Sequence, residues 1–172
     1  VDYINIVDYF KMMRVREDIL KKDSLYTPYR IQDGETPEKI AYQEYGDEQY
    51  YWIILQLNNI TDYYNQWPLS NAELERYAVQ KYGSVVKAEE VHHYETTETR
   101  TEDGLIILAG GIVVDSDFSF TYPSKQGSTV FLTATASAVT NMDYEREVNE
   151  RKTDIEIVNK KYVADYAREF RK

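Results

Sequence analysis

The hydrophobic and polar residues alternate with two different periodicities along the chain, and the change comes near residue 85. Before it, residues 37–45 and 48–59 repeat apolar positions three and four residues apart, which is the spacing of a helix. After it, short apolar runs separated by glycine, proline and aspartate show the two-residue alternation of strands, up to about residue 140. The pattern predicts an α+β protein, with helices first and a small antiparallel β region after them.

The first two predicted helices have clear signals at their ends. Thr36 is suited to cap a helix, Pro37 to occupy its first position, and Gly46 to adopt the left-handed conformation that ends it. Asp47 then caps a second helix over residues 48–59, whose apolar side chains lie on almost all sides. A helix of that kind is expected to be buried from several directions.

The rest of the chain adds a third helix, strands and a charged end. Ser70 and Glu73 have the spacing of a capping box, so a third helix is predicted to start there and to end at Gly83. The strand-like runs that follow predict a meander, in which each strand pairs with the next. Residues 141–172 are charged at first, then alternate, and Asn159 is suited to cap a last, C-terminal helix.

These features divide the chain into four predicted parts. An N-terminal arm covers residues 1–28, and a helical part covers residues 29–84. An antiparallel β region covers residues 85–140. A charged segment with the C-terminal helix covers residues 141–172.

Composition narrows the possible functions. The 172 residues can bury a sizeable core, and 30 acidic against 20 basic residues give a formal net charge of -10. That charge repels phosphate backbones and anionic lipid, so neither nucleic acid nor a membrane is expected as a partner. The sequence has no cysteine, no long apolar run and no secretory signal, so we expect a soluble protein that is not exported.

No catalytic site is recognisable in the sequence. The only histidines, His92 and His93, are neighbours on a predicted strand, so their side chains are expected on opposite faces and unable to hold one metal ion together. Gly110 and Gly111 lie between two apolar runs, where a hairpin turn explains them better than a phosphate-binding loop. The motifs of serine hydrolases, phosphate-binding loops and zinc proteases are missing. We therefore predict a protein that is not an enzyme and has no catalytic residue, metal or cofactor.

Residues 29–60 resemble a LysM domain, a small βααβ fold. The resemblance rests on Gly34-Glu35-Thr36, Ile40-Ala41, Tyr45-Gly46 and Asn58-Asn59. LysM domains commonly bind polymers of N-acetylglucosamine, and the resemblance places that groove between residues 34–36 and 57–60. It implies a LysM-like βααβ head within residues 29–84, to which the third helix is added.

A longer pattern is similar to one family in particular. Asp62, Tyr63 and Tyr64 precede Trp67-Pro68, and Lys81-Tyr82-Gly83 ends the third helix. With these motifs, residues 25–95 and 141–172 look like the LysM-like baseplate wedge subunit of T-even-type contractile-tailed phages, the gene fifty-three family. The strand-rich insert of residues 96–138 carries no motif that the resemblance explains.

The resemblance implies a structural protein of the virion, located in the tail baseplate after synthesis in the host cytoplasm. Its expected partners are other baseplate wedge proteins and neighbouring wedges in a sixfold assembly around a hub, with hub and tail tube proteins as further candidates. Closing such a ring needs two unlike faces on each subunit. The alternative is a LysM module that binds peptidoglycan or N-acetylglucosamine polymers.

The expected interface residues are mostly aromatic, because the chain has 17 tyrosines and aromatic side chains are enriched at protein interfaces. The candidates are Tyr51, Trp52, Asn58, Asn59, Tyr63, Tyr64, Trp67, Tyr162, Tyr166 and Phe170. The apolar neighbours of Trp52 favour a place in the core over an exposed anchor, whereas for Trp67 both readings stay open. Asn58 and Asn59 are expected to face a protein or their own helix end rather than a sugar.

Overall fold

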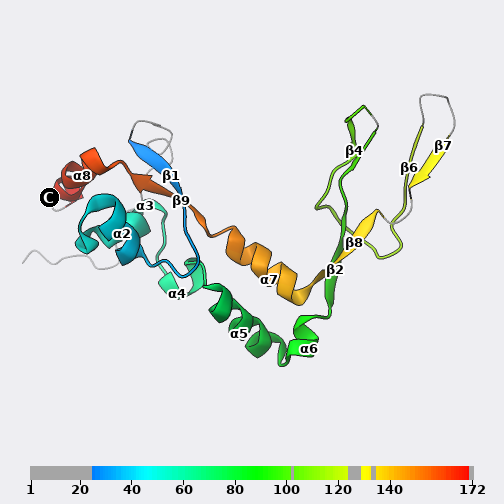
Figure 1. The fold of residues 1–172 in the computed structure, drawn as a ribbon, viewed down its shortest axis with the longest axis horizontal. Helices are drawn as coiled ribbons and strands as arrows, with labels where there is room; N and C mark the ends of the chain where they lie inside the picture. The colour runs from blue at the N-terminus through cyan, green and yellow to red at the C-terminus, as the bar shows by residue number, and fades with distance from the viewer. Residues whose placement is uncertain (1–24, 102, 124–128, 133–134, 171–172) are drawn as a thin grey trace, which may run out of the picture. The chain divides into compact units, whose positions relative to one another are not determined.

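The structure is a computed structural model that describes residues 25–101, 103–123, 129–132 and 135–170 (Figure 1). Its helices and strands are β1 (Tyr26–Arg30), α2 (Pro37–Tyr45), η1 (Glu48–Tyr50), α3 (Tyr51–Leu57), α4 (Tyr63–Gln66), α5 (Asn71–Tyr82), α6 (Val85–Ala88), β2 (Val91–Thr96), β3 (Thr99–Arg100), β4 (Ile106–Leu108), β5 (Val113–Val114), β6 (Phe120–Pro123), β7 (Thr129–Leu132), β8 (Ala136–Thr140), α7 (Asn141–Glu150), β9 (Asp154–Val158), η2 (Lys160–Tyr162) and α8 (Val163–Phe170). The prediction of an α+β protein is confirmed.

The chain forms two compact units. The first holds the residues up to 71 and those from 149 onward, and the second holds residues 72–148. Residues 1–24 of the predicted N-terminal arm lie outside the described residues. As domains, the four parts expected from the sequence stay a prediction.

The helices of the first unit begin and end where their sequence signals predict. The Thr36 hydroxyl accepts a hydrogen bond from the Lys39 amide at 3.4 Å, and Pro37 opens α2. Gly46, with a φ of 86°, ends α2 in the left-handed conformation that glycine adopts most easily. Asp47 caps the next segment, which starts as the 3-10 turn η1 and continues as α3. Both predicted helices are therefore confirmed, the second with a tighter first turn.

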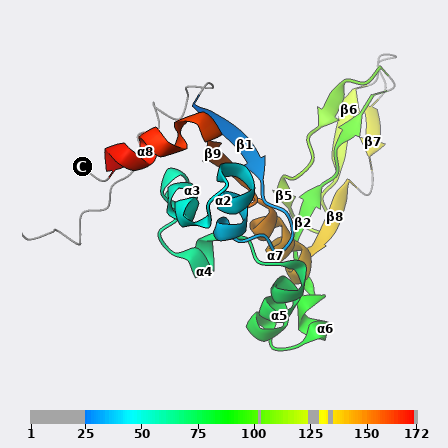
Figure 2. The same ribbon diagram turned by 60° about the vertical axis from the view of Figure 1, so that its left-hand side comes forward.

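The sheet of the first unit joins the two ends of the described chain. Strand β1 pairs antiparallel with β9, from Tyr26 opposite Val158 to Arg30 opposite Asp154. The strand that returns to β1 thus comes from the C-terminal segment and not from the residues directly after α3. Helices α2 and α3 lie against one face of this sheet in both views (Figures 1 and 2). The first unit therefore contains a β-α-α-β order with a long insertion before its last strand, and the LysM likeness itself stays a prediction.

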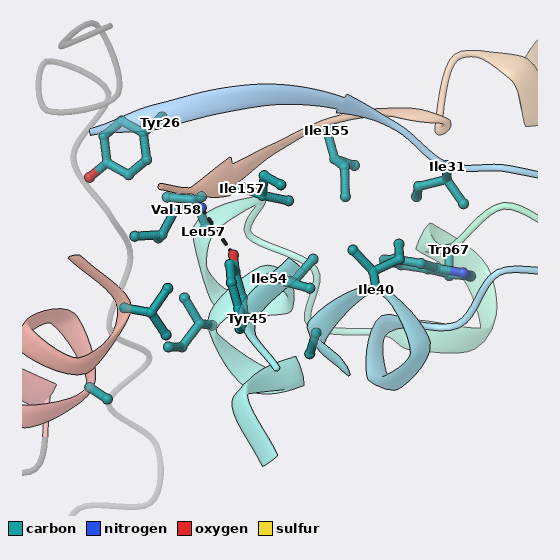
Figure 3. Packing of buried hydrophobic residues seen from close by; sticks show 14 residues of the cluster. Tyr26, Ile31, Ile40, Tyr45, Ile54, Leu57, Trp67, Ile155, Ile157 and Val158 are labelled. Atoms are coloured by element: carbon teal, nitrogen blue, oxygen red, sulfur yellow. Dashed lines mark hydrogen bonds between the residues drawn. The ribbon is translucent and has the colours of Figure 1, made fainter. Parts of the chain in front are cut away.

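The hydrophobic core of the first unit lies between this sheet and the helices (Figure 3). Ile40, Ile53, Ile54 and Leu57 from the helices are almost fully buried, and Ile157 of β9 packs into the same cluster. The other buried hydrophobic members are Tyr26, Ile31, Ala41, Tyr45, Trp67, Ile155, Val158, Val163 and Ala167. The predicted burial of the second helix is confirmed for α3, where Ile53, Ile54 and Leu57 are buried and Trp52 and Leu55 pack partly buried against the same cluster.

The second unit combines most of α5 and α7 with short strands. Strand β2 lies between β5 and β8, while β3 pairs with β4 and β6 pairs with β7. The predicted meander is therefore wrong in its order, because the first strand of the region pairs with the last. In the sequence, the β3–β4 and β6–β7 hairpins lie between these two paired strands. Among the described residues, no helix has the length and apolar character needed to cross a membrane.

A small core and one buried carboxylate hold the helices of the second unit. Ala78, Ala88 and Met142 form a buried cluster. Beside it, the carboxylate of Glu145 on α7 accepts hydrogen bonds from Lys81 Nζ at 2.6 Å and from the Tyr82 hydroxyl at 2.9 Å, both from α5. The hydrogen bond that Lys81 donates to the Glu145 carboxylate raises the pKa of Lys81. The ion pair therefore joins the two helices, and the positive charge of Lys81 offsets the cost of burying the Glu145 carboxylate.

Candidate functional site

The residues expected at an interface do not share one environment. Tyr51, Tyr63, Tyr64 and Asn59 are exposed, and Tyr64 is the most exposed of them at 86%. Trp52, Asn58, Tyr162 and Tyr166 are partly buried. Trp67 is 4% exposed, and the side chain of Phe170, at the end of α8, lies outside the described residues. The structure brings together two groups of these residues, one around α4 and one between α3 and α8.

Around α4, three aromatic side chains run from the core to the surface. The Trp67 indole is buried and donates to the Glu35 carbonyl oxygen at 2.8 Å. The Tyr63 ring stacks on it at 5.8 Å between centroids, and the Tyr64 ring meets Tyr63 edge to face at the same distance. The sequence left open whether Trp67 is buried or is an exposed anchor, and the structure shows it buried in the core of the first unit. Tyr64 then forms the exposed end of an aromatic row that is anchored at its other end.

Helix α4 and the residues directly before it are held by their own polar side chains. Gln66 Oε1 accepts from the backbone amides of Thr61 and Asp62, at 2.7 and 2.8 Å. Asn65 donates its side-chain amide to the carboxylate of Asp62. These bonds fix the backbone of α4, which carries the exposed ring of Tyr64.

The second group lies where α3 meets α8. The rings of Trp52 and Tyr166 are 6.5 Å apart, and both side chains pack against the core cluster. Burial raises the pKa of Tyr166 well above its ordinary value, so its hydroxyl stays neutral throughout the physiological range. Tyr162 lies four residues before Tyr166, on η2, with the Lys161 ammonium 4.7 Å above its ring. The expectation that Trp52 contributes to the core agrees with this packing.

The side-chain amide of Asn58 makes its hydrogen bonds within the chain. Its Nδ2 donates to the carbonyl oxygens of Ile54 and Glu156, both at 2.8 Å, and its Oδ1 accepts from the Glu156 amide at 2.9 Å. The side-chain amide therefore pairs with strand β9 as a neighbouring strand would, while also satisfying the end of α3. Asn59 is exposed and adopts a left-handed conformation, with a φ of 54°. Asn58 thus faces its own helix end, as expected, and a strand 98 residues away.

Both outer edges of the β1–β9 sheet are modified against further strand pairing. On β9, Asn58 covers Glu156, and the Tyr45 hydroxyl accepts from the Val158 amide at 3.0 Å (Figure 3). On β1, the register directs the peptide groups of Pro28 away from β9, and proline has no amide to donate. Edge strands of this kind do not accept an added strand readily. Recognition through this unit is therefore expected to use side chains.

The turn that would form one wall of a LysM groove is also engaged internally. Glu35 is buried, and its carboxylate accepts from the Tyr29 hydroxyl at 3.0 Å and from the Gln32 amide at 2.9 Å. Burial, and next the hydrogen bond to Glu35, raise the pKa of Tyr29 to about 12. Gly34 and Asn58, from the two sides of the expected groove, line different surface depressions. Glu35 and Asn58, which lie in the two segments of that groove, thus use their polar groups to hold the fold.

The prediction that His92 and His93 lie on opposite faces of their strand is wrong. Their Nδ1 atoms are 2.8 Å apart, and His93 Nε2 lies 2.8 Å from a carboxylate oxygen of Glu95. The reason is a β-bulge, because β2 advances from Val91 to His93 while β8 advances by one residue, from Thr140 to Val139. Strict alternation fails at such a bulge. Within the described part of the chain, no group of three or more histidine, aspartate or glutamate side chains is arranged to hold a metal ion.

Sequence reasoning missed several residues that shape this surface. Glu35 and Tyr45 were recognised only as parts of a turn and of a helix stop, yet each bonds a distant segment. Gln66 had no expected role at all. A bulky tyrosine directly before a stop glycine, on the buried side of α2, was the one signal that could have pointed to a core hydroxyl in need of a partner.

Comparisons with known proteins give a consistent result. The sequence profile of the family described as base plate wedge protein 53 matches residues 2–172. The baseplate wedge protein gp53 of Enterobacteria phage T4 is 34% identical to the chain over 65 residues, which is 38% of this chain and 33% of that protein. The matched region therefore spans about a third of the length of this relative.

Proposed function

Because the chain belongs to the base plate wedge protein 53 family, we propose that it is a non-enzymatic structural component of a phage tail baseplate, located in the virion. In this role it binds other wedge proteins and links neighbouring wedges around the central hub. The observation that carries the proposal is the family match over residues 2–172, which covers nearly all of the chain. The wedge protein of phage T4 that it resembles supports the same assignment.

The first unit supports a role in binding proteins through side chains. Its sheet edges are closed by Pro28, Asn58 and Tyr45. Tyr64 is exposed on the short helix α4, which Gln66 holds to the residues before it. Tyrosine offers a large rigid surface and one hydroxyl, which suits it to anchoring at an interface. We place Tyr51, Tyr63 and Tyr64 on the surface that meets a neighbouring wedge protein.

The alternative function, binding of peptidoglycan or N-acetylglucosamine polymers, is less favoured. In that reading residues 34–36 and 57–60 would offer free polar groups to a sugar. Instead the Glu35 carbonyl accepts from Trp67, the Glu35 carboxylate is buried, and Asn58 uses its whole amide on Ile54 and Glu156. A sugar would have to displace these bonds, and each group left unpaired would cost about 1–3 kcal/mol.

Sedimentation of the purified chain with the other wedge proteins of the same phage tests the proposal. We expect a faster-sedimenting complex, and an unchanged sedimentation coefficient at micromolar concentrations would overturn the assignment. Pelleting with insoluble peptidoglycan is the complementary test, in which we expect the chain to stay in the supernatant. Micromolar binding to peptidoglycan would favour the alternative instead.

Substitution of one exposed tyrosine tests the surface. Tyr64→Ser should weaken the complex roughly tenfold or more, the effect of removing an anchor worth about 1.4 kcal/mol or more. Tyr42→Ser is the matched control, because Tyr42 is also exposed, at 66%, and lies in the same unit but outside the α4 row. Equal binding by the two variants would show that Tyr64 does not contribute to the interface, and it would leave the proposed structural role unaffected.

A further inference from the structure

Four side chains of the second unit form a cluster that the structural role does not explain. The Nδ1 atoms of His92 and His93 are 2.8 Å apart, and His93 Nε2 lies 2.8 Å from Glu95 Oε1. The ring of His92 lies parallel to the ring of Tyr144, with 4.2 Å between centroids and an interplanar angle of 7°. Since the histidines and Glu95 are on β2 and Tyr144 is on α7, the cluster connects a strand to a helix.

The proton positions in this cluster follow from its geometry. Glu95 can only accept when it is ionised, so His93 donates through Nε2–H. A neutral His93 with its proton on Nε2 has a lone pair on Nδ1, which can accept. His92 must then donate through Nδ1–H. The two rings therefore share a single proton along the line between their Nδ1 atoms, and they have opposite tautomers.

One additional proton can be accommodated, but two cannot. The first proton can bind His92 at Nε2, which keeps the Nδ1–H donor in place and puts a cation over the face of Tyr144. Of the sites on the two rings, only His93 Nδ1 is then left for the second proton. Two N–H groups would then point at each other across 2.8 Å, so the contact between the rings must open.

We propose that His92, His93 and Glu95 form a proton-sensitive latch, in which the contact between the two rings holds the bulge of β2 closed near neutral pH and opens in acid. Histidine is the side chain whose charge changes in this range, near pH ~6.5 when it is unperturbed. The side chains of His93 and Glu95 are 16% and 23% exposed, so protons from solvent can reach them. The latch is independent of the assembly role proposed above.

The surrounding charges leave the histidine pair to control the opening. Strand β8 (Ala136–Thr140) and strand β5 (Val113–Val114), which flank β2, contain no titratable residue. On α7, Asp143 is bonded to Thr140 and Arg146, and Glu145 to Lys81 and Tyr82. Glu95 is the charged group in direct contact with the pair, and its ionised form favours the closed arrangement.

Nuclear magnetic resonance of the full chain tests the latch directly, because these are the only two histidines in the sequence. Long-range proton–nitrogen spectra at about pH 7.5 should show His92 protonated on Nδ1 and His93 on Nε2. Near pH ~5, nuclear Overhauser contacts between the rings of His92 and His93 should disappear. A mixture of tautomers common to both histidines, or ring contacts that persist in acid, would overturn the proposal.

A variant separates the latch from general acid unfolding. His93→Gln removes the second charge but keeps a polar side chain, so residue 93 should remain in contact with the His92 ring at the acid pH that opens the wild-type protein. Loss of this contact in the same pH range would show that the opening does not depend on the charge of the pair, and would overturn the proposal. The tautomer measurement uses the wild-type chain, so the test does not depend on the folding of the variant.

Discussion

The side chain of Asn58 gives the most direct test of how the first unit is held together. Replacing it with aspartate keeps the shape and one acceptor oxygen but removes both Nδ2 hydrogens, which bond the Ile54 and Glu156 carbonyls at 2.8 Å. A hydrogen bond typically contributes about 0.5–1.5 kcal/mol net, so the two lost bonds amount to ~1–3 kcal/mol. The new carboxylate also faces two carbonyl oxygens, which adds to the loss.

We therefore expect Asn58→Asp to lower the free energy of unfolding by about 2–4 kcal/mol, a large part of the ~5–15 kcal/mol typical of a domain. Both tryptophans of the chain, Trp52 and Trp67, lie in the first unit, so their fluorescence reports its unfolding alone. Urea denaturation followed by tryptophan fluorescence gives the free energy and the slope m. A lower midpoint at unchanged m is the expected result.

Asn59→Asp is the matched control, since it makes the same chemical change one residue later and shifts the net charge equally. Asn59 is exposed, and aspartate tolerates its left-handed conformation, so the change should stay within about 0.5 kcal/mol. Similar destabilisation in both variants would mean that charge, and not the bridge from α3 to β9, determines the outcome. That result would refute the reasoning.

Three further predictions follow from buried polar groups. Tyr45→Phe leaves the Val158 amide without its partner and should cost about 1–3 kcal/mol in the same urea assay. Burial raises the pKa of Tyr45 to about 12, and burial followed by the hydrogen bond to Glu35 does the same for Tyr29. Because these folded values lie above the ordinary value of 10.0, their stabilisation is complete below pH ~10 and is lost as the pH rises towards 12, which fluorescence-detected melting at alkaline pH would show. Glu145→Gln should speed amide hydrogen exchange in α5 and α7 without shifting the tryptophan transition, since Glu145 belongs to the second unit.

Local features of the fold could be predicted from the sequence because their causes are local. Thr36, Pro37 and Gly46 each act on backbone within four residues, and the helix they predict is the helix observed. The cap at Asp47 and the burial of α3 were predictable for the same reason. Such signals do not depend on what the rest of the chain does.

Long-range features could not be read in the same way. The pairing of β1 with β9 depends on two short strands more than 120 residues apart, and neither contains a signal that names its partner. Trp67 illustrates the same limit, because its burial depends on the Glu35 carbonyl, which no local pattern connects to it. The bulge at His92 arises from the register of β8 and is invisible in a strand taken alone.

The late position of β9 in the chain has a consequence for how the protein folds. During synthesis residues 72–148 leave the ribosome before β9 does, so the second unit can fold while the first still lacks half of its sheet. Closing that sheet brings together residues far apart in sequence, a step that is slow because a long loop loses entropy. A nascent chain that stops before residue 154 therefore keeps Ile40, Ile54 and Leu57 without their covering strand, and it is exposed to aggregation and proteolysis until synthesis passes that point.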